Sequence, residues 1–325
     1  MAATSLVKNG IVFLIDALTI PLTPFVALFS KIQSRIGPKR LPISYKIWDF
    51  FGVMPLSYHY YQPVFNASEL SEKTWTEEDP LYGVDLNTEQ QLTLLSKLQY
   101  NDELTQFPIQ KKSENSLDFY YDNWMFCSGD AEILYSLIRH YKPKRLIEIG
   151  SGFSTRIAKQ AIVRNQEEGY RTEHTCVEPY EAPWLEQLGV DRVIRERVET
   201  LPIDFFETLE ANDILFIDSS HVLRTRGDVF YEYLQILPKL KSGVIVHIHD
   251  IFIPFEYPKS WLTQERWFWT EQYLLQAFLV HNSAFEVLLG LNYLAHHHRD
   301  ALNRCCPVFE QQKDRVASSF WIRRK

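Results

Sequence analysis

Three side chains in the second half of the chain, Asp218, His221 and Asp250, have the types and spacing that acid-base or metal chemistry requires. Each acid directly follows an apolar run typical of a buried strand, and the imidazole follows the first acid by three positions. Two carboxylates that meet at one sheet edge either repel each other or share a cation. Magnesium between them would bind two neighbouring oxygens of an acceptor and lower the proton affinity of a hydroxyl, and an imidazole beside them is a candidate general base. We therefore predict Asp218 and His221 as catalytic residues and Asp218 with Asp250 as ligands of Mg²⁺; the structural alternatives are a helix-capping Asp218 and a hydrogen-bonded loop histidine.

A second group of residues surrounds a glycine turn that follows the apolar run 145–149. Gly150 and Gly152 can adopt backbone angles closed to other residues and let a ligand approach the main chain, while Ser154 or Thr155 can cap the next helix. Acids that end parallel strands lie at the carboxyl edge, where a carboxylate can accept both hydroxyls of a ribose. No third glycine follows, so a nucleoside without a diphosphate fits better than a dinucleotide. The predicted cofactor-binding residues are Glu148, Gly150, Gly152, Ser154, Glu178 and Asp218.

Strands and helices alternate from residue 144 onward, and this alternation would position both groups. The predicted strands are 145–149, 174–178, 192–195, 213–217, 243–249, 284–289 and 317–323, and the predicted helices between the first five are 155–167, 181–188, 203–210 and 227–238. Such alternation indicates parallel β-α-β units with helices on both faces of one sheet. We predict an α/β fold with a doubly wound, mostly parallel, seven-stranded sheet.

Composition limits the class of partner. The 325 residues are 46% hydrophobic, which is enough for a sizeable core, and the net charge of −7 argues against a nucleic-acid backbone as partner. The four cysteines show no paired metal-ligand spacing, which favours a reduced, cytoplasmic compartment.

The first 118 residues show a different pattern. Residues 11–29 are strongly apolar but contain Asp16, Pro21 and Pro24, so a spanning helix is not expected. Two interpretations stay open: a hydrophobic arm packed on the body or on a second subunit, or a segment lying on a membrane surface next to the basic residues that follow. We predict three parts: an arm (1–40), an elaboration or cap (41–118), and a nucleoside-binding domain (119–325).

Aromatic residues are dense in two further stretches, 119–126 and 251–269. The first forms either a pocket wall or core. The second, after the fifth strand, forms either a lid that excludes water or a homodimer interface.

Three short motifs carry a family resemblance: Glu148-Ile-Gly-Ser-Gly152, Glu178-Pro-Tyr180 and Asp213-Ile-Leu-Phe-Ile-Asp218. Together they resemble the class I S-adenosylmethionine-dependent methyltransferases over residues 119–325. The resemblance implies that the glycine loop approaches the methionine part of the cofactor and that Glu178 holds its ribose. The runs 218–221 and 247–250 resemble the branch of small-molecule O-methyltransferases that modify sugars on macrolide natural products, although this chain has His249 where the metal-binding members place an acid.

The predicted function is therefore methyl transfer from S-adenosylmethionine to an oxygen of a small-molecule or natural-product acceptor, with His221 as base and Asp218 and Asp250 as candidate magnesium ligands. Two alternatives remain. One is an enzyme similar to the cephalosporin hydroxylases, and the other is a non-catalytic, nucleoside-binding protein associated with membranes through its first 40 residues.

Overall fold

The computed structural model describes the backbone of residues 2–112 and 117–325, with side chains described from Gly10 onward; Met1 of the predicted arm and 113–116 of the predicted elaboration lie outside it. Contacts divide the chain into one unit that ends at Ser71 and another that begins at Glu72. The predicted boundaries, after residues 40 and 118, differ from this division. The physical reason is that residues 72–112 include helices that pack within the second unit, with α4 (Thr88–Lys97) contacting strand β6 (Phe285–Gly290) and helix α13 (Arg299–Cys305).

The first unit contains three helices. They are α1 (Ala2–Thr19), α2 (Thr23–Ile36) and α3 (Pro42–Phe50), followed by a short 3₁₀ turn, η1 (Ala67–Glu69). No single helix in the described chain is long and apolar enough to cross a membrane; one broken pair, Gly10–Thr19 with Thr23–Ile36, bent by 61°, passes by length and composition when taken together.

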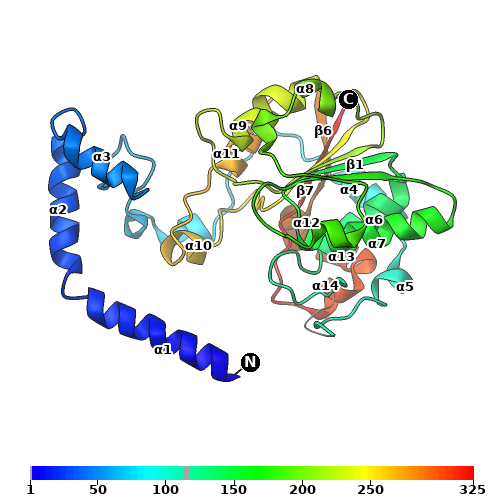
Figure 1. Cartoon of the computed structure of the whole chain (residues 1–325). Coiled ribbons are helices and arrows are strands. Elements are labelled where there is room, and N and C mark those ends of the chain that lie inside the picture. Colours follow the sequence, from blue (N-terminus) through cyan, green and yellow to red (C-terminus); the bar gives the residue numbers. More distant parts are fainter. Residues whose placement is uncertain (1, 113–116) are drawn as a thin grey trace. The chain divides into compact units, whose positions relative to one another are not determined.

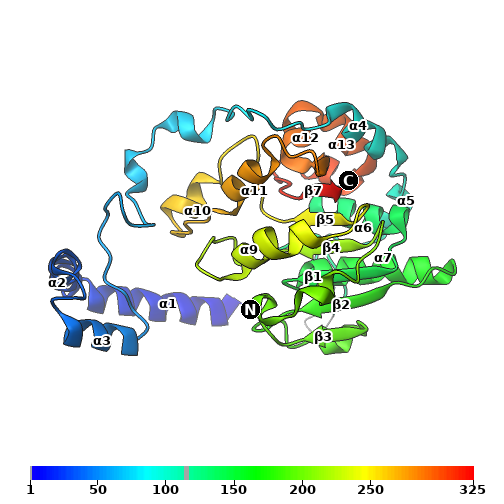
Figure 2. The same ribbon diagram turned by 90° about the horizontal axis from the view of Figure 1, so that it is seen from above.

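The second unit is built on a seven-stranded sheet (Figures 1 and 2). Its strands are β1 (Arg145–Ile149), β2 (Glu173–Val177), β3 (Arg192–Ile194), β4 (Ile214–Ile217), β5 (Ile245–Ile248), β6 (Phe285–Gly290) and β7 (Phe320–Arg324). Their order is β3-β2-β1-β4-β5-β7-β6, and only β7 runs antiparallel to its neighbours. The predicted doubly wound, mostly parallel sheet is confirmed.

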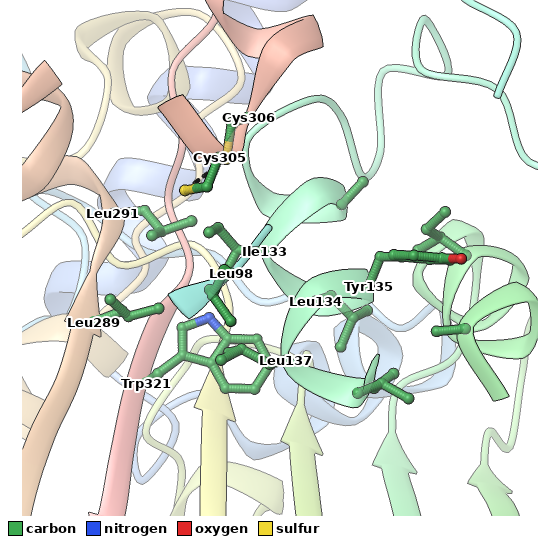
Figure 3. Packing of buried hydrophobic residues seen from close by; sticks show 14 of the residues in the cluster. Leu98, Ile133, Leu134, Tyr135, Leu137, Leu289, Leu291, Cys305, Cys306 and Trp321 are labelled. Atoms are coloured by element: carbon green, nitrogen blue, oxygen red, sulfur yellow. Dashed lines mark hydrogen bonds between the residues drawn. The ribbon is translucent and has the colours of Figure 1, made fainter. Parts of the chain in front are cut away.

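Helices cover both faces of this sheet. In the part that the structure describes, the α-helices of this unit are α4, α5 (Asn101–Leu104), α6 (Asp130–Tyr141), α7 (Phe153–Glu167), α8 (Ile203–Phe206), α9 (Asp228–Tyr231), α10 (Lys259–Thr263), α11 (Glu271–Leu279), α12 (Leu291–His297), α13 (Arg299–Cys305) and α14 (Pro307–Gln311). Alternate strand residues point to opposite faces, so Leu146 belongs to a core with α6 and α7, and Ile147 to a core with α9 and α11. In the first core, the Trp321 indole of β7 lies close to Leu137 of α6 and Leu98 (Figure 3).

The start of α6 is fixed by a buried carboxylate, Glu132. Its Oε2 accepts hydrogen bonds from the backbone N–H groups of Gly129 (2.9 Å) and Phe309 (3.0 Å), and its Oε1 accepts from that of Val308 (2.8 Å). Burial raises the pKa of Glu132 to about 7, although these three donors oppose the shift.

Three predicted helices differ in detail. The helix predicted for 203–210 is only α8, and that for 181–188 is a single 3₁₀ turn, η3 (Leu185–Leu188), because Pro183 and Gly189 leave too few residues for an α-helix. The helix predicted for 227–238 begins as α9, continues as a π-helical turn (η5, Glu232–Ile236) and closes as a 3₁₀ turn (η6, Leu237–Lys239). The remaining 3₁₀ turns are η2 (Glu72–Trp75) and η4 (Val198–Thr200).

Strand register determines which residues meet at the functional edge. Ile149 pairs with both Val177 and Ile217, and Ile217 pairs with Ile248. The carboxyl ends of β1, β2, β4 and β5 therefore lie side by side, and the residues that follow them share one edge of the sheet.

Candidate functional site

The two glycines of the turn after β1 have different roles. Gly150 has φ +78°, and a Cβ atom there would lie 1.8 Å from the backbone oxygen of Asp218. The close approach of the backbone that follows β4 therefore requires glycine at this position, whereas we predicted that Gly150 lets a ligand approach the main chain. At Gly152 no heavy atom lies within 4 Å of such a Cβ, so this glycine faces open space that a bound molecule can occupy.

The acid of the loop motif, Glu148, points into the core. It is fully buried, its Oε2 accepts a hydrogen bond from the Thr155 hydroxyl (2.6 Å), and its Oε1 lies 2.9 Å from Nε2 of His174. Glu148, His174 and Cys176 lie close enough together to hold a metal ion. They are one of two such groups of acidic, histidine or cysteine side chains among the described residues. The geometry makes Glu148 a support behind the loop and does not favour the predicted direct contact with the cofactor.

Helix α7 is capped by Thr155, whose Oγ1 accepts from the N–H of Gly152 at 3.0 Å. Ser154, the other predicted cap, is buried as the second residue of the helix.

Glu178 follows β2 and holds the loop from the other side. Its Oε2 accepts from the N–H of Ser151 (3.2 Å), and its Oε1 accepts from those of Tyr180 (2.9 Å) and Glu181 (2.8 Å). The residue is 8% exposed, and its two carboxylate oxygens have acceptor capacity left beyond these three bonds.

Asp218, His221 and Asp250 meet at the same edge. Nε2 of His221 lies 3.3 Å from Oδ1 of Asp218 and 3.8 Å from Oδ2 of Asp250. The three form the second group that could hold a metal ion, with one donor atom from each lying within 4.8 Å of the others. Both carboxylates are partly exposed while the imidazole is buried, so the oxygens are the atoms that a ligand reaches first.

A residue that we had not predicted, Glu271 at the start of α11, completes this group. Its Oε2 lies 2.8 Å from Nδ1 of His221. The sequence offers little signal for it, because a glutamate in the first turn of a helix is common for electrostatic reasons alone.

The charges around His221 favour its cationic form. Burial alone would lower the pKa of His221, but its contacts with Asp218 and Glu271 outweigh burial and raise that pKa well above the usual value. Burial likewise opposes the ionisation of Asp218, yet the charge of His249 and the contact with His221 bring the pKa of Asp218 below its usual value. These contacts favour an imidazolium at His221 among carboxylates.

Backbone strain marks two of these residues. His221 has φ +58° and Asp250 has φ +55°, in the left-handed region that costs a non-glycine residue roughly 1 kcal/mol or more. Such strain persists only where surrounding contacts hold it. Here the backbone oxygen of His221 accepts from the N–H groups of Thr270 and Glu271, and Asp250 Oδ1 accepts from the Ser318 hydroxyl at 3.0 Å.

His247, within β5, and His249, directly after it, differ. His247 is stacked on Phe216 at 4.0 Å, and burial lowers its pKa well below the usual value, so it is a neutral core residue. Nε2 of His249 lies 3.7 Å from Oδ1 of Asp250. Burial opposes protonation of this histidine, but the charges of Asp250, Asp218 and Asp130 raise its pKa.

The aromatic segment after β5 lies against the site. The Trp269 ring is centred 4.3 Å from the His221 imidazole, and Trp267 stacks on Trp269 at 4.9 Å. An indole face beside an imidazolium favours its positive charge. The contact is consistent with the predicted lid over the site. The alternative, a homodimer interface, also stays a prediction.

Sequence comparisons identify the fold family. Residues 147–251 match the family model of a methyltransferase domain. An uncharacterised protein of Archaeoglobus fulgidus is 32% identical over 166 residues, which cover 48% of this chain and 74% of that relative.

Two solved structures give weaker likenesses. The O-methyltransferase TomG of Streptomyces achromogenes, in complex with SAM, is 14% identical with a TM-score of 0.34, over 70% of this chain and 87% of TomG. An O-methyltransferase of Bacillus cereus, in complex with SAH, is 12% identical with a TM-score of 0.34, over 73% of this chain and 91% of that one. Scores this low carry no argument about acceptor or mechanism. With the sheet order and the glycine turn described above, the family model shows that residues 147–251 of this chain belong to a methyltransferase domain of the class I, S-adenosylmethionine-dependent kind.

Proposed function

We propose that the enzyme transfers the methyl group of S-adenosylmethionine to a hydroxyl oxygen of a small-molecule acceptor, at the edge formed by Asp218, His221 and Asp250. The observation that carries this proposal is the orientation of His221. Its Nδ1 faces Glu271 at 2.8 Å, so its Nε2 faces Asp218 and the open side of the site. A histidine held in this way can take the proton that a hydroxyl loses during methyl transfer.

The residues present fit a nucleoside cofactor. The open space at Gly152 admits a molecule close to the main chain, and the Glu178 carboxylate at the neighbouring strand end can accept ribose hydroxyls. When bound, S-adenosylmethionine supplies the methyl group on a sulfonium. Thr155 and Glu148 hold the loop in place from behind.

The same edge fits a hard divalent cation. Asp218 and Asp250 offer oxygen donors of the type that Mg²⁺ prefers. When bound, such an ion would lower the proton affinity of an acceptor hydroxyl. Two carboxylates around one ion would favour an acceptor with neighbouring hydroxyls, as in the sugars of natural products.

His221 must lose its own proton before it can act as a base. Asp218 and Glu271 stabilise its cation, and the positive charge of a bound sulfonium or divalent ion would oppose that protonation. The proton from the acceptor then passes to Nε2, while Glu271 keeps the ring oriented and stabilises the resulting imidazolium.

Product formation with a panel of vicinal diols, including nucleotide sugars, glycosides and catechols, tests the proposal. We expect His221→Ala to bind S-adenosylmethionine as the wild type does and to lower the rate by about 10²–10⁴-fold, the usual contribution of a positioned base. The matched control is His281→Ala, which removes an exposed imidazole on another surface. Full activity in His221→Ala would disprove the base assignment, and full activity after exhaustive chelation would leave Asp218 and Asp250 as orienting groups.

A further inference from the structure

The first unit buries almost none of its side chains. Of residues 10–71, the structure buries only Gln33, Pro55 and Ala67. The contacts between α2 and α3 are polar: Nε1 of Trp48 donates to Oε1 of Gln33 at 2.5 Å, and the Tyr45 hydroxyl donates to the Gln33 carbonyl at 3.2 Å. In this unit an amide side chain is buried and apolar side chains are exposed, which is the reverse of how a water-soluble protein places its polar and apolar residues.

In the part of α1 whose side chains the structure describes, the apolar exposure extends around the full circumference of the helix. Five consecutive residues, from Ile11 to Ile15, are 52–72% exposed. Successive helical residues are rotated by about 100°, so five in a row cover every side of the helix. A groove on a protein partner would cover one stripe, whereas hydrocarbon surrounds a helix completely.

The dimensions fit one leaflet of a bilayer. Helices α1 and α2 are about 27 Å and about 21 Å long at the usual rise per residue, so each is shorter than the roughly 30 Å hydrocarbon core. The break between them bends the chain by 61°. Asp16, one turn before the break, would be costly at the bilayer centre but can reach the headgroups from a shallow position.

Basic residues follow the apolar stretch directly. Between Asp16 and Asp49 there is no acid, and the basic residues are Lys31, Arg35, Lys39, Arg40 and Lys46, all exposed. Residues 1–71 contain six Lys or Arg and three Asp or Glu, a net charge of +3; since the chain carries −7, residues 72–325 carry −10. A net positive charge is therefore found in the part of the chain that exposes the apolar helices, and the rest of the chain is net negative.

Exposed aromatic rings lie on the C-terminal side of the basic residues. They are Phe50, Phe51, Tyr58, Tyr60 and Tyr61, each more than half exposed. Aromatic rings of this kind are enriched at the boundary between hydrocarbon and headgroups.

From these observations we infer that residues 10–61 form a monotopic membrane anchor, in which α1 and α2 enter one leaflet of an anionic bilayer and residues 31–46 contact its phosphate headgroups. The apolar helices supply hydrophobic binding and the basic residues supply attraction to acidic lipid, the two contributions that stable attachment requires. This inference does not depend on the acceptor or on the base assigned above.

Flotation of the full-length protein with phosphatidylcholine vesicles, with and without phosphatidylserine, tests the inference. We expect the wild type to bind the phosphatidylserine vesicles more tightly and to lose this preference at high salt. Phe13→Glu with Phe25→Glu should weaken binding by about a hundredfold or more, because two exposed rings no longer enter hydrocarbon. Lys39→Gln with Arg40→Gln should weaken it by about thirtyfold, and only on phosphatidylserine vesicles.

The matched control replaces two exposed valines of the second unit, Val163→Glu with Val316→Glu, and should bind as the wild type does. Binding of S-adenosylmethionine should be unchanged in all variants, which shows that the second unit is folded. Wild-type flotation by the phenylalanine variant would overturn the inference. So would a wild type that fails to float but forms a dimer that the phenylalanine variant disperses, because the occupant of the apolar surface would then be a second copy of the chain. If the Lys39/Arg40 variant kept full binding, the role of the anionic lipid would be disproved.

Discussion

Nδ1 of His221 lies 2.8 Å from Oε2 of Glu271, a fully buried residue fifty positions further along the chain. The contact joins the loop after β4 to the start of α11 and determines which ring nitrogen faces Asp218. A histidine of the same loop without this partner could rotate or exchange tautomers. Glu271 is therefore a positioning residue for the proposed base.

We predict that Glu271→Gln lowers kcat by about 10–100-fold while the Kd of S-adenosylmethionine stays unchanged. Removing the negative charge also makes the imidazolium easier to deprotonate, so the acidic limb of the rate profile should move to lower pH. The matched control is Glu232→Gln. Burial, followed by the charge of Glu271, raises the pKa of Glu232 well above its usual value, so a neutral amide should replace it with little effect. A pH profile that does not move would contradict the role of Glu271.

The two loop glycines should separate stability from binding. Gly150→Ala places a Cβ against the Asp218 carbonyl and forces a strained φ, so we expect a loss of several kcal/mol, or failure to fold. In Gly152→Leu the new side chain projects into open space. This variant should keep the wild-type thermal midpoint of unfolding but bind S-adenosylmethionine about tenfold or more weakly. Thermal unfolding and calorimetric titration of both variants measure this difference. Equal cofactor affinity in Gly152→Leu would show that the open space is not the cofactor site.

Glu178→Ala should weaken cofactor binding by roughly 1–3 kcal/mol, since ribose hydroxyls and the Ser151 amide would lose their acceptor. Glu181→Ala, an exposed acid on the same turn, is the control and should leave the Kd unchanged. Titration of both variants with 5′-methylthioadenosine, which keeps the ribose but lacks the amino-acid part, should show the same loss for Glu178→Ala. If only S-adenosylmethionine were affected, the ribose assignment would be wrong.

Glu132 should make stability depend on pH. Its folded-state pKa of about 7 lies above the roughly 4.3 of an unfolded chain, so its contribution is fully present below pH 4 and is lost as the pH rises through 7. In Glu132→Gln this dependence disappears. Urea unfolding between pH 5 and pH 8 should therefore show the wild type losing its advantage over the variant as the pH rises. An advantage that grows with pH would mean that the three backbone donors outweigh burial.

The sheet could be predicted from the sequence because its strands are short apolar runs bounded by turn and helix-start residues. Every predicted strand overlaps an observed one. The family matches also favour the methyltransferase over the two other classes that the sequence had left open. The site was harder to predict, because its contacts are tertiary. The strand-end rule brought Asp218 and Asp250 together, but no local pattern reveals that Glu271 reaches His221 or that Gly150 faces a carbonyl of β4. The π-helical turn was missed for the same reason, since its residues also fit an ordinary amphipathic helix.

The position of β7 between β5 and β6 has a consequence for how the protein is made. All six other strands precede it in the chain, so a ribosome releases β5 and β6 before the strand that must separate them exists. Until 320–324 emerge, the nascent chain holds two unpaired apolar edges and lacks the indole of Trp321 in one core. Completing a sheet in which β5 and β6 are already in place requires a strand insertion rather than an edge addition, and we expect the sheet without β7 to be the species that a chaperone would have to shield.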